Sequence, residues 1–285
     1  MKILGLVLSM VLILTGCNRD RANDGSDGPD GRDATGASPT VTAEAESPGS
    51  DAAPAQGPSP AAPPAQAAQG RPLESQAVQP AAPGSYLYDE SGTRSFGGCG
   101  PDGPPPSPTS LRIDPANGDR QQGIRDRRSA AGQGMVVTTI LEYRTDGIYL
   151  VYLRQEQQTP AGPSISEFEP NPPVLAMPAR PTQGQSWQFS LTSKDGKIHV
   201  EASNTIEALD EEVAAGGGTA KATRVKRTTR ATGQSILGPI DITENAVSWV
   251  SSRLIVKEVS DSSGTVGTCR IQSHIEAVIR STSPS

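Results

Sequence analysis

Alternation of apolar and polar residues dominates the chain from residue 84 onward. Met135, Val137, Thr139, Leu141 and Tyr143 occupy every second position, which places them on one face of an extended strand. An Asp-Gly pair follows, and such a pair between alternating segments is typical of a hairpin turn. The same pattern predicts further strands at residues 86–88, 111–113, 148–153, 187–191, 198–202, 220–230, 247–259 and 266–279.

A proline-rich segment separates two groups of predicted strands. Residues 159–181 hold seven prolines, which cannot donate a backbone hydrogen bond and therefore do not fit a central strand or a helix interior. We expect a crossover here, between a first β-rich half at residues 84–158 and a second at residues 182–285. Residues 207–215 are the one local helix candidate, and a strand end with a turn fits them equally well.

The predicted fold class is mostly β, with antiparallel sheets in two half-domains of the sandwich or half-barrel type. Ahead of them, residues 17–83 contain no aromatic residue and few large aliphatic ones. This composition cannot bury enough apolar surface to offset the conformational entropy of the chain, so we expect a disordered tether. Acidic residues outnumber basic ones in the tether, and it therefore carries most of the net charge of −6.

A short apolar run opens the chain, at residues 3–14. It is shorter than the ~20 residues of a membrane-spanning helix and is typical of an export signal. The run ends in Leu14-Thr15-Gly16-Cys17, which resembles the lipobox of bacterial lipoproteins. The resemblance implies that residues 1–16 are a signal peptide and that Cys17 is acylated. An ordinary signal peptide with an incidental cysteine is the alternative.

The lipobox resemblance also implies a location and a partner. Acylated Cys17 would insert into the lipid bilayer at the extracytoplasmic face of the cell membrane, and two or three acyl chains would hold it stably. An outer membrane is possible where the host has two membranes.

The second half of the chain resembles the exported β-rich proteins of the TapB-like class. The resemblance covers about residues 182–285 and rests on residues typical of hairpins. These are Gln185-Ser186-Trp187, Glu212-Val213, Gly217-Gly218-Thr219, Ala222, Val225, Trp249-Val250-Ser251 and Lys257-Glu258. It implies a bacterial envelope protein with a β fold, and no assigned biochemical activity.

Two cysteines remain once Cys17 is assigned to the lipid. Cys99 and Cys269 form an even pair in an oxidising compartment, so we predict a disulfide between them; two free buried thiols are the alternative. A bridge that closes a loop of this length would stabilise the fold by up to ~5 kcal/mol on the chain-entropy model.

Basic residues cluster in one predicted strand: Lys221, Arg224, Lys226, Arg227 and Arg230. One interpretation is contact with anionic lipid or a cell-wall polymer. The other is an exposed strand whose charges are balanced by acidic residues of the preceding segment. Lys226 and Arg227 are consecutive and point to opposite faces, which argues against a single basic stripe. Nucleic acid does not fit an exported protein without aromatic residues in the cluster.

Catalytic and metal-binding motifs are missing from the sequence. His199 and His274 have no second histidine or cysteine at ligand spacing, so we expect solvated strand residues and no metal or cofactor. We therefore expect a non-enzymatic binding or structural module. A carrier of lipid or another apolar molecule between the halves is the alternative, suggested by the apolar residues 148–153. A hydrolase that uses carboxylates such as Glu211 and Glu212 is a second alternative.

Overall fold

The structure is a computed structural model that describes residues 78–285, except residues 98, 101, 130, 131, 133, 160, 161 and 236. The predicted signal peptide, Cys17 and most of the predicted tether lie outside the described residues. Within that part of the chain, thirteen strands form and no helix does.

The strands of the predicted first half are β1 (Gly84–Ser95), β2 (Thr109–Ile113), β3 (Arg120–Arg128), β4 (Gly134–Tyr143) and β5 (Gly147–Thr159). Two more, β6 (Gly162–Phe168) and β7 (Val174–Pro178), lie in the predicted crossover. Those of the second half are β8 (Ser186–Thr192), β9 (Ile198–Ala215), β10 (Gly218–Ser235), β11 (Gly238–Ser251), β12 (Leu254–Val266) and β13 (Cys269–Ile279).

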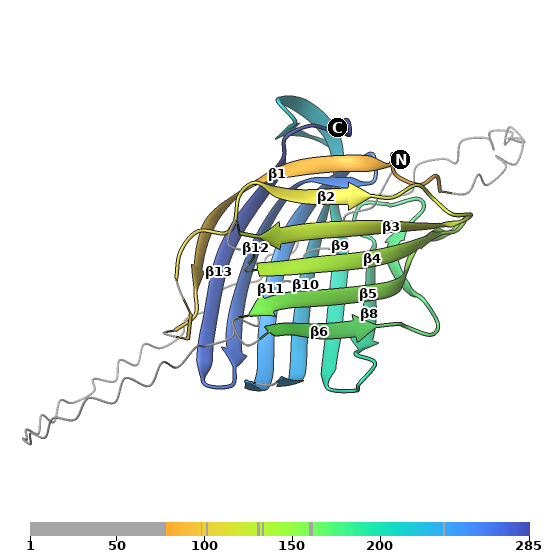
Figure 1. Cartoon of the computed structure of the whole chain (residues 1–285). Helices are drawn as coiled ribbons and strands as arrows, with labels where there is room; N and C mark the ends of the chain where they lie inside the picture. Colours follow the sequence, from red (N-terminus) through yellow and green to blue (C-terminus); the bar gives the residue numbers. More distant parts are fainter. Residues whose placement is uncertain are drawn as a thin grey trace, which may run out of the picture. The chain divides into compact units, whose positions relative to one another are not determined.

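A single antiparallel sheet contains both halves. Its strand order is β6-β5-β4-β3-β2-β1-β13-β12-β11-β10-β9-β8, with β7 paired to β5. Strand β1 joins the halves, because its residues up to Tyr88 pair with β2 and those from Tyr88 onward pair with β13. Figure 1 shows the sheet curled over, so that β2–β6 run across β8–β13. The predicted antiparallel, mostly β fold class is confirmed.

The two ends of the sheet approach each other after β6. Phe168 and Ser193 form an isolated antiparallel bridge, and the Lys194 backbone N–H donates to the Glu167 carbonyl at 2.7 Å. The proline-rich segment expected to be only a crossover thus contains β6 and β7, each of which forms its ladder with β5. Proline fits such positions because an edge strand leaves some backbone N–H groups without a ladder partner.

Residues of the predicted tether, which was expected to end at residue 83, pack against the β body. Ala81 is buried, and its backbone N–H donates to Gln121 Oε1 at 2.9 Å. The Gln121 amide in turn donates to the Ala81 carbonyl at 2.9 Å. A buried glutamine on β3 therefore takes the place of a strand partner for this segment.

Turns divide two of the predicted strands. Ser252 and Arg253 have φ of 48° and 66° and separate β11 from β12, inside the segment that was predicted to be one strand at 247–259. Gly267, with φ of 59°, lies between β12 and β13 inside the predicted strand at 266–279. The first turn has neither glycine nor asparagine at its positive-φ positions, so its sequence carries no turn signal.

Inward-facing side chains from both halves form the core. Tyr86, Leu111, Leu150, Val225 and Val256 are among the buried apolar residues. Fully burying a side chain of the size of valine or leucine contributes about 1.5–3 kcal/mol, so this core accounts for much of the stability.

A disulfide joins Cys99, beyond the end of β1, to Cys269, at the start of β13, with a Cα–Cα distance of 5.6 Å.

Candidate functional site

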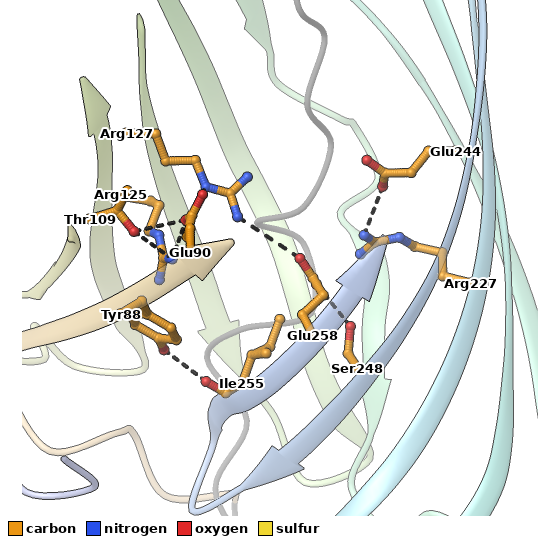
Figure 2. Close-up of polar contacts among 10 residues, drawn as sticks. All are labelled: Tyr88, Glu90, Thr109, Arg125, Arg127, Arg227, Glu244, Ser248, Ile255 and Glu258. Atoms are coloured by element: carbon orange, nitrogen blue, oxygen red, sulfur yellow. Dashed lines mark hydrogen bonds and ion pairs between the residues drawn. The ribbon is translucent and has the colours of Figure 1, made fainter. Parts of the chain in front are cut away.

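Charged and hydroxyl side chains lie inside the curled sheet, where an apolar core would be expected. We call these residues the polar belt, and each has less than a tenth of its surface exposed. Its members are Glu90, Thr109, Arg125, Arg127, Arg227, Glu244, Ser248 and Glu258. They come from β1, β2, β3, β10, β11 and β12, and Figure 2 shows that they converge between the two halves.

Glu90 is the centre of the belt in the first half. Its Oε1 accepts from Arg125 at 2.7 Å, from Thr109 at 2.8 Å and from Arg127 at 3.0 Å. Arg125 and Arg127 are two residues apart on β3, so strand alternation directs both guanidinium groups to the same interior face. One carboxylate thus holds two buried cations.

Tyr88 connects this centre to the second half. Its ring lies under the Arg125 guanidinium, 3.6 Å from the ring centroid, and its hydroxyl donates to the Ile255 carbonyl at 2.8 Å. Burial raises the pKa of Tyr88 to about 12, so the phenol keeps its proton for this bond. Strand β1 is in this way attached to the start of β12.

Glu258 and Glu244 carry the belt through the second half. Glu258 Oε1 lies 3.9 Å from Arg127 Nη2, which makes Arg127 the ionic connection between β3 and β12. Glu258 Oε2 accepts from the Ser248 hydroxyl at 2.9 Å. Glu244 Oε1 accepts from Arg227 at 3.1 Å. Figure 2 shows the Arg127–Glu258 and Arg227–Glu244 ion pairs as dashed lines.

The two end carboxylates have opposite pKa shifts. Burial would raise the pKa of Glu90, but Arg127 and Arg125 outweigh burial and hold that pKa at about 2. Burial also raises the pKa of Glu244, and there Arg227 only partly offsets it because Glu258 adds a like charge. Glu90 is therefore a fixed anion, whereas Glu244 is the weaker acid of the two.

Several belt atoms have no hydrogen-bond partner within the described residues. They include Arg125 Nε, Arg127 Nη1 and Glu244 Oε2. Ser262 and Ser273 are in register with Glu244 along one row of the sheet, and their hydroxyls are also without a partner there. Buried groups of this kind are normally satisfied by ordered water, so the interior beside Glu244 is suited to polar contents.

The predicted basic cluster is divided between the two faces of β10. Arg227 faces inward and belongs to the belt. Arg224 faces outward and pairs with Glu207 and Glu211 of β9 at 3.1 and 2.9 Å. Arg230 pairs with Asp241 at 3.0 Å, and Lys221 and Lys226 are exposed. The arrangement agrees with the balanced-strand interpretation for Arg224.

The other candidates from the sequence lie outside the belt. His199 and His274 are exposed and face acidic residues, with His274 Nδ1 2.8 Å from Asp261 Oδ1. Glu211 is bound by Arg224 and by the Trp249 indole N–H. Among the described residues no group of three or more potential ligands could hold a metal ion.

Sequence reasoning did not assign Glu90, Arg125, Arg127, Glu244 or Glu258 to an interior site. The signal that could have found two of them is the alternation in β3, where Gln121, Gly123, Arg125 and Arg127 share one face. Glu90, Glu244 and Glu258 carry no comparable local signal, because each sits in an ordinary alternating strand. Arg127 and Glu258 lie on strands distant in sequence, which only the curled sheet brings together, whereas Arg227 and Glu244 lie on the neighbouring strands β10 and β11.

Comparisons with known proteins find little. No protein-family model and no curated protein match the sequence. Among solved structures, one similar chain is a Bacteroides fragilis protein with a YmcC-like fold that is thought to be exported, with a TM-score of 0.36 and 11% identity. That match covers 71% of this chain and 96% of the other. The resemblance to TapB-like proteins stays a prediction.

The described part of the chain has no helix of the length and hydropathy that a membrane crossing needs.

Proposed function

We propose that this chain is a lipid-anchored protein of the cell envelope whose β body is a non-enzymatic binding or structural module. The proposed anchor is acylated Cys17, at the end of a tether that separates the body from the membrane surface. The disulfide between Cys99 and Cys269 supports an extracytoplasmic location, because such bonds persist in oxidising compartments.

The observation that carries the proposal is the mutual neutralisation of the interior charges. Glu90 is held by Arg125 and Arg127, and Glu244 is held by Arg227. A carboxylate with a pKa of about 2 is a poor proton donor or base near neutral pH, where catalysis favours groups with matched pKa values. The arrangement supports a role in fixing the two halves in register, and it gives a hydrolase little support.

The belt also bears on the carrier alternative. A lipid chain between the halves would have to lie against Glu90, Arg127 and Glu258. An acyl chain offers no hydrogen bond to belt atoms that lack a partner among the described residues, such as Arg127 Nη1, so this contact would be costly. Of residues 148–153, only Ile148, Leu150 and Leu153 are buried in the interior. The geometry therefore favours a module over a carrier of apolar molecules.

The anchor is tested by expressing the full chain in a bacterium with an alkyne-labelled fatty acid. We expect label on the wild type and none on Cys17→Ala, with the wild type alone entering the detergent phase of a temperature-induced split. A Cys99→Ala variant is not a matched control because it breaks the disulfide, so Ser26→Ala in the predicted tether serves instead. Label that persists in Cys17→Ala would contradict the proposed anchor.

The carrier alternative is tested on the same preparation. Native mass spectrometry of the gently extracted protein should show the mass of the chain and its acyl groups alone. A stoichiometric additional lipid that survives in Cys17→Ala would favour the carrier.

A further inference from the structure

The outward face of the second half carries short polar side chains in continuous rows across its strands. One row runs through Gln188, Ser203, Thr228, Asn245, Asp261 and His274, one residue from each of β8 to β13. All six are exposed. At about 4.8 Å between neighbouring strands the row is about 24 Å long.

This row is the floor of a depression. A hollow of 510 Å³ lies over β8–β10 and is lined by Gln188, Ser203 and Thr228. A second hollow of 360 Å³ lies over β11–β13 and β1 and is lined by Asn245, Asp261 and His274. The Thr228 hydroxyl donates to Asn245 Oδ1 at 2.9 Å, so the two linings are in contact. We call the combined feature the outer trough.

Several charged groups around the outer trough lie against a group of opposite charge or a histidine of the protein itself. Asp261 binds His274 at 2.8 Å, and Arg230 binds Asp241 at 3.0 Å. Glu201 lies 3.5 Å from His199. Asp261 and Glu201 are balanced only where these histidines are protonated, and Arg94, whose guanidinium donates to the Pro104 carbonyl at 2.8 Å, also lines the second hollow. The six residues of the row include no lysine or arginine, so the floor itself gives an anionic polymer no such cation to contact.

The groups that remain available are hydroxyls and amides. Each hydroxyl both donates and accepts a hydrogen bond, and each amide offers two donors and an acceptor. Protein partners usually bury aromatic and apolar anchors in an interface. No residue of the row is apolar, and among the residues that line the two hollows only Phe189 and Ala202 are. An uncharged chain that presents many hydroxyl groups matches this surface in charge and in hydrogen-bonding capacity.

We propose that the outer trough binds an uncharged glycan chain laid across strands β8–β13. Contact with such a chain does not depend on the lipid anchor, so the proposal stands or falls separately from the proposed location. It replaces the basic cluster as the place where an envelope polymer would contact this protein.

The test uses the full chain carrying Cys17→Ser, which removes the anchoring thiol from every arm. Cosedimentation is measured with insoluble neutral polysaccharides, namely cross-linked dextran, mannan and galactan, and with purified peptidoglycan. We expect retention on at least one of the three neutral polysaccharides, unchanged between 0.05 and 0.5 M NaCl, because uncharged contacts are not screened.

Thr228→Val with Asn245→Leu removes the hydrogen-bonding groups from the middle of the outer trough while keeping similar side-chain volume. We expect at least tenfold weaker retention. Thr138→Val, on the outward face of β4 in the first half, is the matched control and should bind as well as the parent. Retention that is absent on all neutral polysaccharides, confined to a charged polymer and lost in high salt, or unaffected by the double variant would overturn the proposal.

Discussion

Two arginine–carboxylate pairs join β10 to β11, and they differ in almost nothing except the face on which they lie. Arg227 reaches Glu244 at 3.1 Å inside the sheet, and Arg230 reaches Asp241 at 3.0 Å outside it. The side chains of the inner pair are 5% and 5% exposed, whereas those of the outer pair are 58% and 55% exposed. Three positions along one strand thus change a solvated pair into a buried one.

The difference shows how position on the sheet decides the energetic weight of an ion pair. Solvent screens the outer pair, so this pair contributes little to the free energy of unfolding. The inner pair has given up its hydration, so each member depends on the other. The presence of a buried pair is therefore weak evidence for stability. Removing one member should nevertheless lower the free energy of unfolding strongly, because it leaves the other charge buried without a counterion.

Removal of one inner partner should have the largest effect. Arg227→Leu leaves Glu244 buried opposite an apolar group, and we expect a loss of about 3–5 kcal/mol in the free energy of unfolding at pH 7. The loss should shrink toward pH 4, because a protonated Glu244 no longer needs a counterion. Urea unfolding at both pH values measures it, with Arg230→Leu as the exposed control on the same strand. Equal losses for the two variants would contradict the comparison.

Acid should destabilise the protein through Glu90. The folded pKa of Glu90 is about 2, below its ordinary value of 4.5, so its ionised form stabilises the fold above pH 4.5. That contribution is about 3 kcal/mol and should be lost as the pH falls from about 4.5 through 2. Unfolding curves of wild type and Glu90→Gln over this range test it. The variant starts less stable and should lose less on acidification, and a parallel pH dependence of the two proteins would refute the assignment.

Replacement of both inner partners should cost far less than replacement of one. Arg227→Leu with Glu244→Leu removes the charges together, and apolar replacements of buried pairs are often neutral or stabilising by about 1–4 kcal/mol. We therefore expect the double variant to be at least as stable as wild type in urea. If it were as unstable as Arg227→Leu alone, the pair would be needed for more than mutual charge compensation.

Features that depend on residues close in sequence could be predicted here, whereas features that depend on distant residues could not. Alternation and Asp-Gly turns are local, so the antiparallel β class and the hairpin at Asp146-Gly147 could be predicted, and β4 and β5 indeed pair on either side of that turn. The alternation at Lys226 and Arg227 likewise predicted opposite faces. The joining of both halves through β1 could not be predicted, because it depends on which distant strand pairs with each end of β1. The polar belt was missed for the same reason: Glu90 and Arg127 are unremarkable until the sheet curls.

Loss of the outer pair should give the smallest effect. Asp241→Asn removes the counterion of Arg230, yet water can solvate the guanidinium, so we expect a much smaller change in the free energy of unfolding than for Arg227→Leu. The same pair should respond to salt, since the Debye length falls to about 3 Å at 1 M and screens exposed charges. The measurement is a double-mutant cycle of Arg230→Leu and Asp241→Asn in 0.05 and 1 M NaCl. We expect its coupling energy to disappear at high salt, whereas the cycle for Arg227 and Glu244 should keep most of its coupling because the belt excludes the ions that would screen it.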